Sequence, residues 1–532
     1  MTIGRSTLSR QSLLYLPSTS GTYDGRPSEP TAPDRTTPGP DSSTRPDRVA
    51  VPGTSGAPVT ATQTITDSRI HRARAFVPRR PVLCAAVFCL LSFTGFWIAQ
   101  RAAQVSMVDL LVYRAEGWTV RDAQDLYDMR ATQHNLPNTY PPFAALVFTP
   151  LTVMGTGLLR TFGTAVNLGL MVAVAHLSLR LIDLPARVPR PAAVLALAAV
   201  AVWCEPVWTT LRYGQINPLV TALVLWDLTR RAGHRWAGVG TGIATGIKLT
   251  PGLFVVFLGL AGLLLGLRRL WAAGAARGGG EPGSRLPRRR FWNDHLRRTG
   301  VATAAFALTV AFSALALPHD SRRFWTEVLF ATDRPGDVEG AGNQNLKGAL
   351  ARILHTPDPG MWWLMAAALV GCVGLATAVA AQLTDDSRLP NARAWAALTC
   401  AVTALMVSPV SWSHHWVWAV PMVLLLAVEA VRRRTAGWTA WTVMTGLLFC
   451  SFMVWYAPHS RPTRVELHQN PAQMLLTAVY PLVGIAFLGV AAYLTLRAVR
   501  RPWEGSGTVG RQLAAAGPDA ARRRPERIYA RG

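Results

Sequence analysis

Charged residues are scarce in this chain. Asp, Glu, Lys and Arg make up only 16% of its 532 residues, whereas 50% of the residues are hydrophobic. This balance excludes an ordinary soluble globular protein and is typical of a polytopic membrane protein. Lysine is almost absent: Lys248 and Lys347 are the only two, so nearly all of the positive charge is carried by arginine.

Cysteine is scarce, and neither a cleavable leader nor an internal repeat is evident. The six cysteines show neither metal-ligand spacing nor paired loops, and we expect them to be small core residues. The first apolar stretch begins near Pro81 between arginines, which indicates a first membrane span rather than a signal peptide. The lack of a repeat argues against an inverted-repeat transporter. The cysteines are Cys84, Cys89, Cys204, Cys372, Cys400 and Cys450.

The positive charge is unevenly distributed. The net charge of +25 comes from 54 Lys and Arg residues against 29 Asp and Glu. Of those 54 residues, 40 fall in segments that alternate along the chain with the proposed outer loops. The outer loops themselves contain 11. This positive-inside pattern predicts a multi-pass cell-membrane protein with both termini in the cytoplasm, and no nucleic-acid partner. The basic segments are the residues up to Arg80, 180–190, 230–235, 268–298, 388–393, 432–434 and 497–532.

Composition divides the chain into a membrane domain with two tails. Residues 1–68 are rich in Pro, Ser, Thr and Gly, which predicts a disordered cytoplasmic tail. Residues 500–532 form a second, basic tail suited to anionic membrane lipids. The domain between them, 81–496, contains a Gly- and Arg-rich stretch, 270–298, that we expect to be a flexible cytoplasmic loop.

The apolar stretches predict an all-α membrane bundle. About 20 apolar residues are needed for one crossing. Residues 143–157 are too few, which favours a re-entrant or interfacial helix, and glycines in 237–248 indicate close helix packing. We expect 11 to 13 crossings. The candidates are 81–100, 161–180, 191–207, 216–230, 237–248, 250–267, 300–317, 361–383, 394–410, 415–431, 437–456 and 472–496.

The polar motifs gather on one side of these spans. A transporter typically has polar groups along its spans, whereas an enzyme working at one interface has them on one face. Long loops on a helical scaffold are also where function usually lies. The proposed outer segments are 101–142, 208–215, 318–360, 411–414 and 457–471.

Asp109 is an acid in apolar sequence just after the first span. Removing a carboxylate from water at the membrane edge costs free energy, so we expect Asp109 to have a specific role. It is either a general base for an acceptor hydroxyl or a helix-end acid paired with a neighbour such as Arg114. The more polar surroundings of the following acids indicate solvated surface residues: Glu116, Asp122, Asp125 and Asp128.

Two outer turns carry further candidates. Tyr140 precedes Pro141-Pro142, which predicts an extended turn and then a helix start, with Tyr140 as a possible site residue. In the Arg212-to-Pro218 segment, the amides of Gln215 and Asn217 suit sugar hydroxyls. Alternatively, Asn217 caps the next helix.

The two lysines and a histidine pair could bind an anion. Lys248, on a broken helix, and Lys347, after the Asn343-Gln344-Asn345 motif, are placed to meet a lipid phosphate, although Lys248 could also be a snorkelling structural residue. Adjacent helical side chains point about 100° apart, so His414 and His415 do not suit one metal ion. A phosphate or hydroxyl contact from one of them, beside Trp412, is the better interpretation.

Taken in order, these motifs resemble glycosyltransferase family 87. The resemblance implies a GT-C membrane fold over about 81–496, no cofactor, and actinobacterial α-1,2-mannosyl transfer from polyprenyl-phosphate-mannose. It also implies that Asp109 is the catalytic aspartate and that His414-His415 lies in the active site. The matching elements are Asp109 to Tyr113, Tyr140-Pro141-Pro142, Phe148-Thr149-Pro150-Leu151, Gly214-Gln215-Ile216-Asn217, Gly246-Ile247-Lys248 with Pro251, Asn343-Gln344-Asn345, and Ser408-Pro409 with Ser411-Trp412 and His414-His415.

The expected chemistry is one in-line displacement with inversion. A lipid phosphate is a good leaving group, so one base and cationic stabilisation suffice where soluble glycosidases need two carboxylates. Asp109 would deprotonate a glycolipid or glycan acceptor on the extracytoplasmic face, and Lys248 with His414 or His415 would hold the phosphate. Arg212 and Lys347 are further candidates for that role, and binding roles are also expected for Tyr113 and Asn345.

Two other classes remain open. A lipid-linked sugar flippase or transporter predicts polar residues at mid-span, and a membrane scaffold predicts no convergent site. Convergence of the polar residues in one outer cavity would favour the enzyme. Mannose is implied by the resemblance alone, and arabinose remains an alternative sugar.

Overall fold

The computed structural model describes residues 80–105, 107–184, 189–275, 291–331, 334, 336–459 and 463–500. The predicted tails, 1–68 and the residues after 500, lie outside this described part, as do residues 276–290 of the predicted cytoplasmic loop. The described residues form helices joined by loops, as the all-α prediction requires. Their β-type pairings are two isolated bridges, Ala131 with Leu136 and Asn343 with Trp412.

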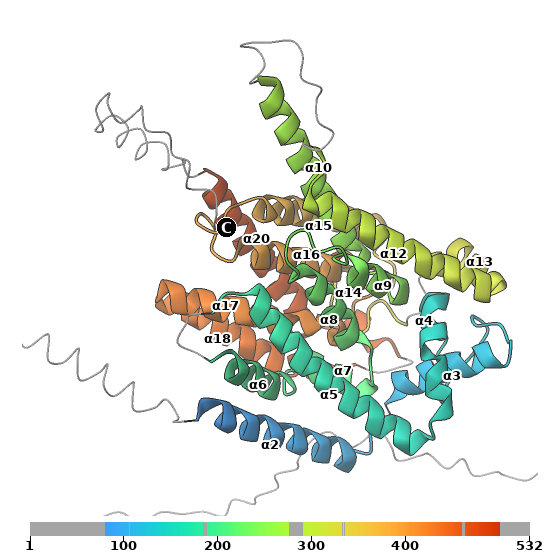
Figure 1. Cartoon of the computed structure of the whole chain (residues 1–532). Helices are drawn as coiled ribbons and strands as arrows, with labels where there is room; N and C mark the ends of the chain where they lie inside the picture. Colours follow the sequence, from blue (N-terminus) through green and yellow to red (C-terminus); the bar gives the residue numbers. More distant parts are fainter. Residues whose placement is uncertain are drawn as a thin grey trace, which may run out of the picture. The chain divides into compact units, whose positions relative to one another are not determined.

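Seven of the described helices are long and apolar enough to cross a membrane (Figure 1). The pair α6 (Arg190–Ala201) and α7 (Glu205–Tyr213), bent by 76°, makes an eighth if it crosses as one span. The chain is therefore polytopic. The seven are α2 (Pro81–Ala102), α5 (Thr156–Leu181), α10 (Gly252–Ala275), α12 (Asp294–Ala316), α15 (Gly360–Gln382), η3 (Ser413–Trp418) continued by α17 (Ala419–Arg433), and α20 (Val479–Arg500).

The remaining predicted spans are shorter than the sequence indicated, so by helix length the described part offers seven or eight crossings rather than 11 to 13. Chain breakers are the reason. Gly238, with φ of 117°, precedes α9, and extended Lys248 followed by Pro251 ends it. Nine helical residues extend only about 14 Å, against about 30 Å of hydrocarbon. The short helices are α8 (Asn217–Leu228), α9 (Val239–Ile247), α16 (Ala392–Val407) and α18 (Ala436–Cys450).

Shorter elements fill the predicted outer segments. The predicted re-entrant or interfacial segment is a short helix that Pro150 turns into a 3-10 turn, which agrees with its predicted shortness. The predicted loop 208–215 is mostly helical, because α7 runs to Tyr213. These elements are α3 (Val108–Arg121), α4 (Pro142–Phe148), η1 (Thr149–Val153), α13 (Pro318–Thr326), η2 (Val328–Phe330), α14 (Leu346–Ile353), η4 (Met453–Trp455), η5 (Val465–His468) and α19 (Pro471–Thr477).

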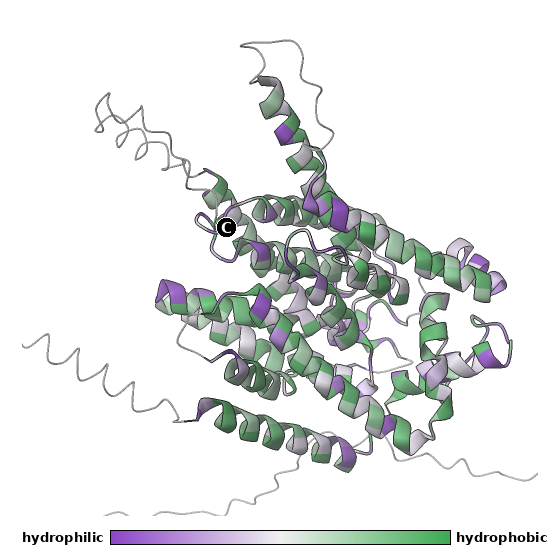
Figure 2. Ribbon diagram, in the orientation of Figure 1, coloured by the Kyte–Doolittle hydropathy of each residue, from purple (hydrophilic) through white to green (hydrophobic). Residues whose placement is uncertain are grey.

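The helices divide into peripheral and central ones. On α2, which lies beside α6 (Figure 1), Leu90 is 68% exposed, and hydrophobic residues cover most of the helix (Figure 2). Such an apolar exposed face suits contact with lipid chains. On α16, by contrast, Trp395 and Met406 are fully buried. The core of the bundle therefore surrounds α16.

Glycines allow the short helix α9 to approach the longer helix α12. A Cβ atom at Gly242 of α9 would lie 2.4 Å from the carbonyl oxygen of Ala302 in α12, and one at Gly246 would lie 2.2 Å from Thr309 Oγ1. No larger residue fits there without a shift of α12. The predicted close packing of the glycine-rich stretch is thus confirmed, and it fixes the position of Lys248 at the end of α9.

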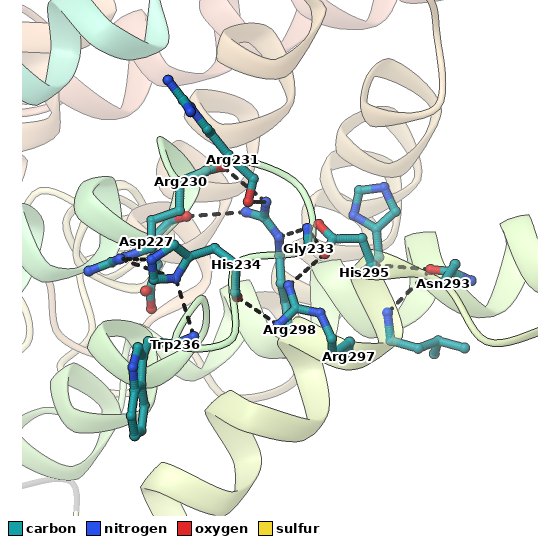
Figure 3. Close-up of polar contacts among 12 residues, drawn as sticks. Asp227, Arg230, Arg231, Gly233, His234, Trp236, Asn293, His295, Arg297 and Arg298 are labelled. Atoms are coloured by element: carbon teal, nitrogen blue, oxygen red, sulfur yellow. Dashed lines mark hydrogen bonds and ion pairs between the residues drawn. The ribbon is translucent and has the colours of Figure 1, made fainter. Parts of the chain in front are cut away.

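Polar contacts at the predicted cytoplasmic end join α8, α12 and α16, and Figure 3 shows those between Arg298 of α12 and the end of α8. Buried Arg298 of α12 donates to the carbonyl oxygens of Asp227 and Arg230, at 3.2 and 3.0 Å, after the last turn of α8. Arg393 likewise donates to the Leu228 carbonyl at 2.6 Å. These arginines satisfy carbonyl groups that a helix end leaves without partners. Because α10 extends to Ala275 and α12 begins at Asp294, the predicted loop 270–298 is shorter than expected.

The cysteines only partly follow the prediction. Cys89 and Cys400 are buried, as expected for core residues, whereas Cys84 and Cys372 are exposed on apolar helices. The Sγ atoms of Cys204, before α7, and Cys450, at the end of α18, lie 3.1 Å apart. Packing between helices far apart in the sequence brings this pair together, which no local spacing could indicate.

Candidate active site

Asp109 lies in the first turn of α3 and is half-buried. Its Oδ2 atom accepts a hydrogen bond of 2.6 Å from Gln215 Nε2. The alternative pairing with Arg114 is wrong, because Arg114 donates instead to the Met154 carbonyl and to Thr156 Oγ1. The carboxylate is thus held by an amide from another segment and not by an ion pair at the end of its own helix.

Gly214 is what allows that contact. It ends α7 with φ of 71°, a left-handed conformation that favours glycine. A Cβ atom at Gly214 would lie 2.6 Å from the Cβ of Leu110, the residue after Asp109. The absent side chain lets the turn after α7 approach α3, which brings Gln215 to Asp109.

Two tyrosines complete the surroundings of Gln215. The hydroxyl of Tyr113, one turn after Asp109, donates to Gln215 Oε1 at 2.8 Å and lies 3.0 Å from the hydroxyl of Tyr140. Tyr113 also stacks on Phe148, with 4.3 Å between ring centroids. Pro141 is extended and α4 begins at Pro142, as predicted, so the double proline turns Tyr140 toward Asp109's helix. The structure thus brings Asp109, Tyr113, Tyr140 and Gln215, which were separate candidates in the sequence, into one group.

A second group surrounds Lys248. Its Nζ atom donates to Asn217 Oδ1 at 3.0 Å and lies 3.0 Å from His415 Nε2. When Lys248 is protonated it only donates, so Nε2 is then the acceptor and neutral His415 carries its proton on Nδ1. Asn217 also donates to the His414 carbonyl at 2.9 Å. The predicted capping role of Asn217 is wrong: α8 starts at Asn217 itself, and its side chain binds Lys248 and His414 instead of the helix end.

His414 and His415 begin a 3-10 segment, η3, rather than lie on a regular α-helix. Their rings meet edge to face with 4.8 Å between centroids. His414 packs against Tyr213 and is buried, with its Nε2 atom unpartnered among the described residues. His415 is half-buried beside Lys248. The two histidines therefore have different surroundings, and His415 is the one available to a ligand.

A pocket opens beside this second group. One side is polar and includes Asn217, Lys248, Ser411 and His415. The other side is apolar, from α8, α10, α16, η3 and the loops before α10 and after α16. Its apolar residues are Val220, Pro251, Phe254, Ala401, Ala404, Leu405, Val410 and Trp418. A ligand with an anionic head and a hydrocarbon chain matches both sides.

Electrostatics couple the two groups. Burial raises the pKa of Asp109 to about 6, although the Gln215 hydrogen bond and the positive charge of Lys248 act in the opposite direction. Burial lowers the pKa of Lys248 to about 7, opposed by the negative charge of Asp109. The carboxyl and ammonium groups thus titrate close to neutral pH, as expected of groups that exchange protons or bind anions.

The remaining predicted residues hold the walls of the site. Asn345 caps α14 through the Gly348 amide and donates to the Ser408 carbonyl at 2.6 Å. Lys347 is buried with its ammonium 4.8 Å from the Trp363 ring centroid. The Trp412 backbone pairs with Asn343. Arg212 is half-buried in the last turn of α7. Asn345 and Trp412 thus contact backbone groups of neighbouring segments, and Lys347 contacts the Trp363 ring.

Glu116 differs from its prediction as a surface acid. It is fully buried on α3, and neither carboxyl oxygen has a hydrogen-bond partner among the described residues. Burial, and then the charge of Asp109, raise its pKa well above the usual value. Its seven-residue spacing from Asp109 places both acids on one helix face, a signal that the polar local sequence obscured.

The other predicted surface acids agree better with their prediction. Asp122 and Asp128 are exposed, and Asp125 is half-buried in an ion pair with Arg323. In the described part, Asp125, His319 and Asp320 have ligand atoms within 4.8 Å of one another. Asp125 and Asp320 already bind Arg323 and the Leu126 amide, which competes with a metal ion.

Glu205 was missed altogether by the sequence reasoning. It is 0% exposed at the start of α7, and its carboxylate accepts hydrogen bonds from several other elements. A lone acid between Cys204 and Pro206 in apolar sequence was the available signal, as it was for Asp109.

The comparisons with known proteins agree with this arrangement. The model of glycosyltransferase family 87 matches residues 138–280 and 290–409. A phosphatidylinositol pentamannoside mannosyltransferase of Mycobacterium tuberculosis (strain CDC 1551 / Oshkosh) is 31% identical over 69% of this chain and 78% of its own length. Its counterpart from Mycolicibacterium smegmatis is 30% identical over 83% of this chain and 98% of its own length.

A third relative, a phosphatidylinositol mannoside mannosyltransferase of Mycolicibacterium smegmatis, is 31% identical over 74% of this chain and 86% of its own length. All three relatives carry names that include "polyprenol-phosphate-mannose-dependent" and "alpha-(1-2)". No solved structure matches the chain. Because relatives at least 30% identical are matched over most of their length and the family model matches two segments, this chain belongs to glycosyltransferase family 87.

Proposed function

We propose that this chain is an inverting α-1,2-mannosyltransferase of the extracytoplasmic membrane face. It transfers mannose from polyprenyl-phosphate-mannose to a phosphatidylinositol mannoside or a related glycolipid. The names of the relatives supply the donor and the acceptor class. The observation that carries the proposal is the placement of Asp109 and the Lys248–His415 pair around one site, each with a pKa or a hydrogen bond suited to its role.

The residues divide the reaction between them. The acceptor hydroxyl oxygen attacks the anomeric carbon of the donor while the bond from that carbon to the phosphate oxygen breaks. The hydroxyl proton passes to Asp109, and the bonding electrons leave with the polyprenyl phosphate. Gln215 holds the carboxylate in place through a charge-assisted hydrogen bond. A positioned base of this kind contributes a factor of about 10²–10⁴ to the rate.

The leaving group is stabilised on the opposite side. Lys248 offers positive charge to the phosphate, and the Nδ1–H group of His415 offers a second donor. Preorganised donors aimed at developing negative charge are usually the largest contribution to catalysis. The apolar wall of the pocket, with Phe254, Leu405 and Trp418, accommodates the first isoprene units. Displacement on one face of the sugar then converts a β-linked donor into an α-linked product.

This arrangement favours transfer over transport. A flippase needs polar groups along a path through the bundle, whereas Asp109, Gln215, Lys248 and His415 come together where α3, α7, α9 and η3 meet. Convergence of this kind supports an enzyme site.

The test is a transfer assay with the purified full chain in lipid nanodiscs. Polyprenyl-phosphate-[³H]mannose and the matching arabinose donor are each offered with phosphatidylinositol mannosides of different lengths. We expect α-1,2-linked mannosyl product, identified by linkage-specific mannosidase digestion and NMR of the anomeric proton. Transfer of arabinose in place of mannose, or a β-linked product, would contradict the proposal.

A further inference from the structure

The buried carboxylate of Glu205 joins four elements behind the histidine pair. Its Oε1 atom accepts from Thr209 Oγ1 at 2.8 Å, from Ser413 Oγ at 2.8 Å and from Trp455 Nε1 at 2.9 Å. Its Oε2 atom accepts from the Tyr480 hydroxyl at 2.6 Å. These donors lie on α7, η3, η4 and α20, so one side chain connects segments that are distant in the sequence.

The chemistry of these contacts suits a carboxylate and no other side chain of that size. All four partners donate, and an indole N–H group can only donate. Glutamine would replace one oxygen by an NH₂ group: beside Trp455 this group would face a donor, and beside Tyr480 the hydroxyl would have to accept instead of donate, which loses its bond to the carboxylate. The position at the first turn of α7 also favours negative charge, because the amino end of a helix is positive. Burying a carboxylate costs free energy, so we expect this residue to have a structural or functional role.

One of the four partners is next to the active site. Ser413 directly precedes His414 and His415 at the start of η3. The His414 carbonyl is held by Thr210 Oγ1 at 2.6 Å and by Asn217. Thus α7 holds the histidine segment at two consecutive residues, one through Glu205 and one through Thr210.

We propose that Glu205 is a positioning residue that, through Ser413, fixes where His415 meets Lys248 and the donor phosphate. This inference rests on the proposed function, because it concerns how that site is held. The hydrogen bonds of Glu205 reach neither Asp109 nor Lys248, so its effect on the site passes through Ser413 and the backbone of η3. A displacement of about 1 Å at a reacting group is enough to lower a rate about 100-fold.

A double-mutant cycle tests the proposal. Mannosyl transfer is measured for Glu205→Gln, Ser413→Ala and the double variant in nanodiscs. We expect kcat to fall about 10- to 100-fold in each single variant, with less than a threefold change in the KM for the acceptor, since α3 and Asp109 are held separately. We expect the double variant to be no slower than the slower single variant.

A matched control separates positioning from general stability. Glu429 on α17 is another fully buried carboxylate, and it pairs with Arg432 and Arg433 at the predicted cytoplasmic end. Glu429→Gln should lower the thermal unfolding midpoint without lowering kcat. Glu205→Gln should lower kcat beyond any change that its own unfolding midpoint explains.

The outcomes are distinguishable. An inactive wild-type chain overturns the proposed function, and with it the positioning role that rests on that function. Wild-type kcat in Ser413→Ala, or multiplied losses in the double variant, overturns the positioning role while transfer stands. If Glu205→Gln does not fold, Ser413→Ala alone decides, because it removes the same contact with a small change.

Discussion

At the scale of single residues, the two groups to which we assign the chemistry have pKa values near neutrality. Asp109 acts as a base only when it is deprotonated, so transfer rises as the pH increases through about 6. Lys248 attracts phosphate only when it is protonated, so transfer falls as the pH increases through about 7. A bell-shaped profile of kcat/KM with a narrow top follows.

The acidic side of that profile depends on Gln215. Its hydrogen bond lowers the pKa of Asp109 against the effect of burial. Gln215→Leu should therefore raise that pKa and move the acidic limb of kcat/KM to higher pH, with the basic limb in place. The measurement is transfer rate against pH for both forms. A limb that stays put or moves to lower pH would show that Gln215 does not tune the base.

The two lysines allow a direct comparison. Lys248→Met should raise the KM for the polyprenyl-phosphate donor about 10- to 100-fold, since a charge-assisted hydrogen bond contributes about 1.5–3 kcal/mol and 1.4 kcal/mol is tenfold. Lys347→Met removes the chain's other lysine, whose ammonium lies over Trp363. A larger increase of the donor KM in the Lys347 variant than in the Lys248 variant would mean that Lys347, and not Lys248, binds the phosphate.

At the scale of elements, broken and short helices place the site. α9 ends at Ile247 and leaves Lys248 extended, and α7 ends at Gly214, which admits Gln215 to α3. The sequence indicated these breaks through glycine and proline. It did not indicate how far each helix runs, because a span cut to 9 or 12 residues has the same apolar composition as part of a full crossing.

The glycine contact between α9 and α12 gives an element-scale prediction. Gly242→Ala places a methyl group where the Ala302 carbonyl and Ala305 already lie, and overpacking of this kind costs about 1–3 kcal/mol. Gly300→Ala, on α12, adds its methyl to open space and should be neutral or stabilising by up to about 1 kcal/mol. Thermal unfolding in detergent compares them. Equal midpoints for the two variants would mean that α9 and α12 are not packed this closely.

The candidate site shows a similar division between what sequence predicts and what it does not. Asp109 was a candidate because a carboxylate in apolar sequence is costly, Gln215 because its amide suits sugar hydroxyls, and Lys248 and His415 because they could bind a phosphate. Glu205 was missed although its apolar neighbours gave a signal, and Glu116 was misjudged because its polar neighbours did not reveal its burial. The partners of Asn217 were likewise set by helices far away in the sequence rather than by the helix that it begins.

At the scale of the whole molecule, the described helices place the candidate site and the arginine contacts at opposite helix ends. The loop after α8, with Ala232, joins the end at which Arg298 binds, and Gln133 belongs to the segment after α3. With the native cysteines replaced by serine, Gln133→Cys should react with an impermeant maleimide on intact cells. Ala232→Cys should react only after the membrane is opened. The reverse pattern would put the site in the cytoplasm.

The account as a whole depends on Asp109 taking the proton of the acceptor. The most direct measurement is mannosyl transfer by Asp109→Asn in nanodiscs, alongside binding of the polyprenyl-phosphate donor. Asparagine keeps the shape and the contact with Gln215 but cannot act as a base. We predict that transfer falls at least about 100-fold while donor binding and the unfolding midpoint stay near wild type. Transfer at the wild-type rate in this variant would contradict the mechanism.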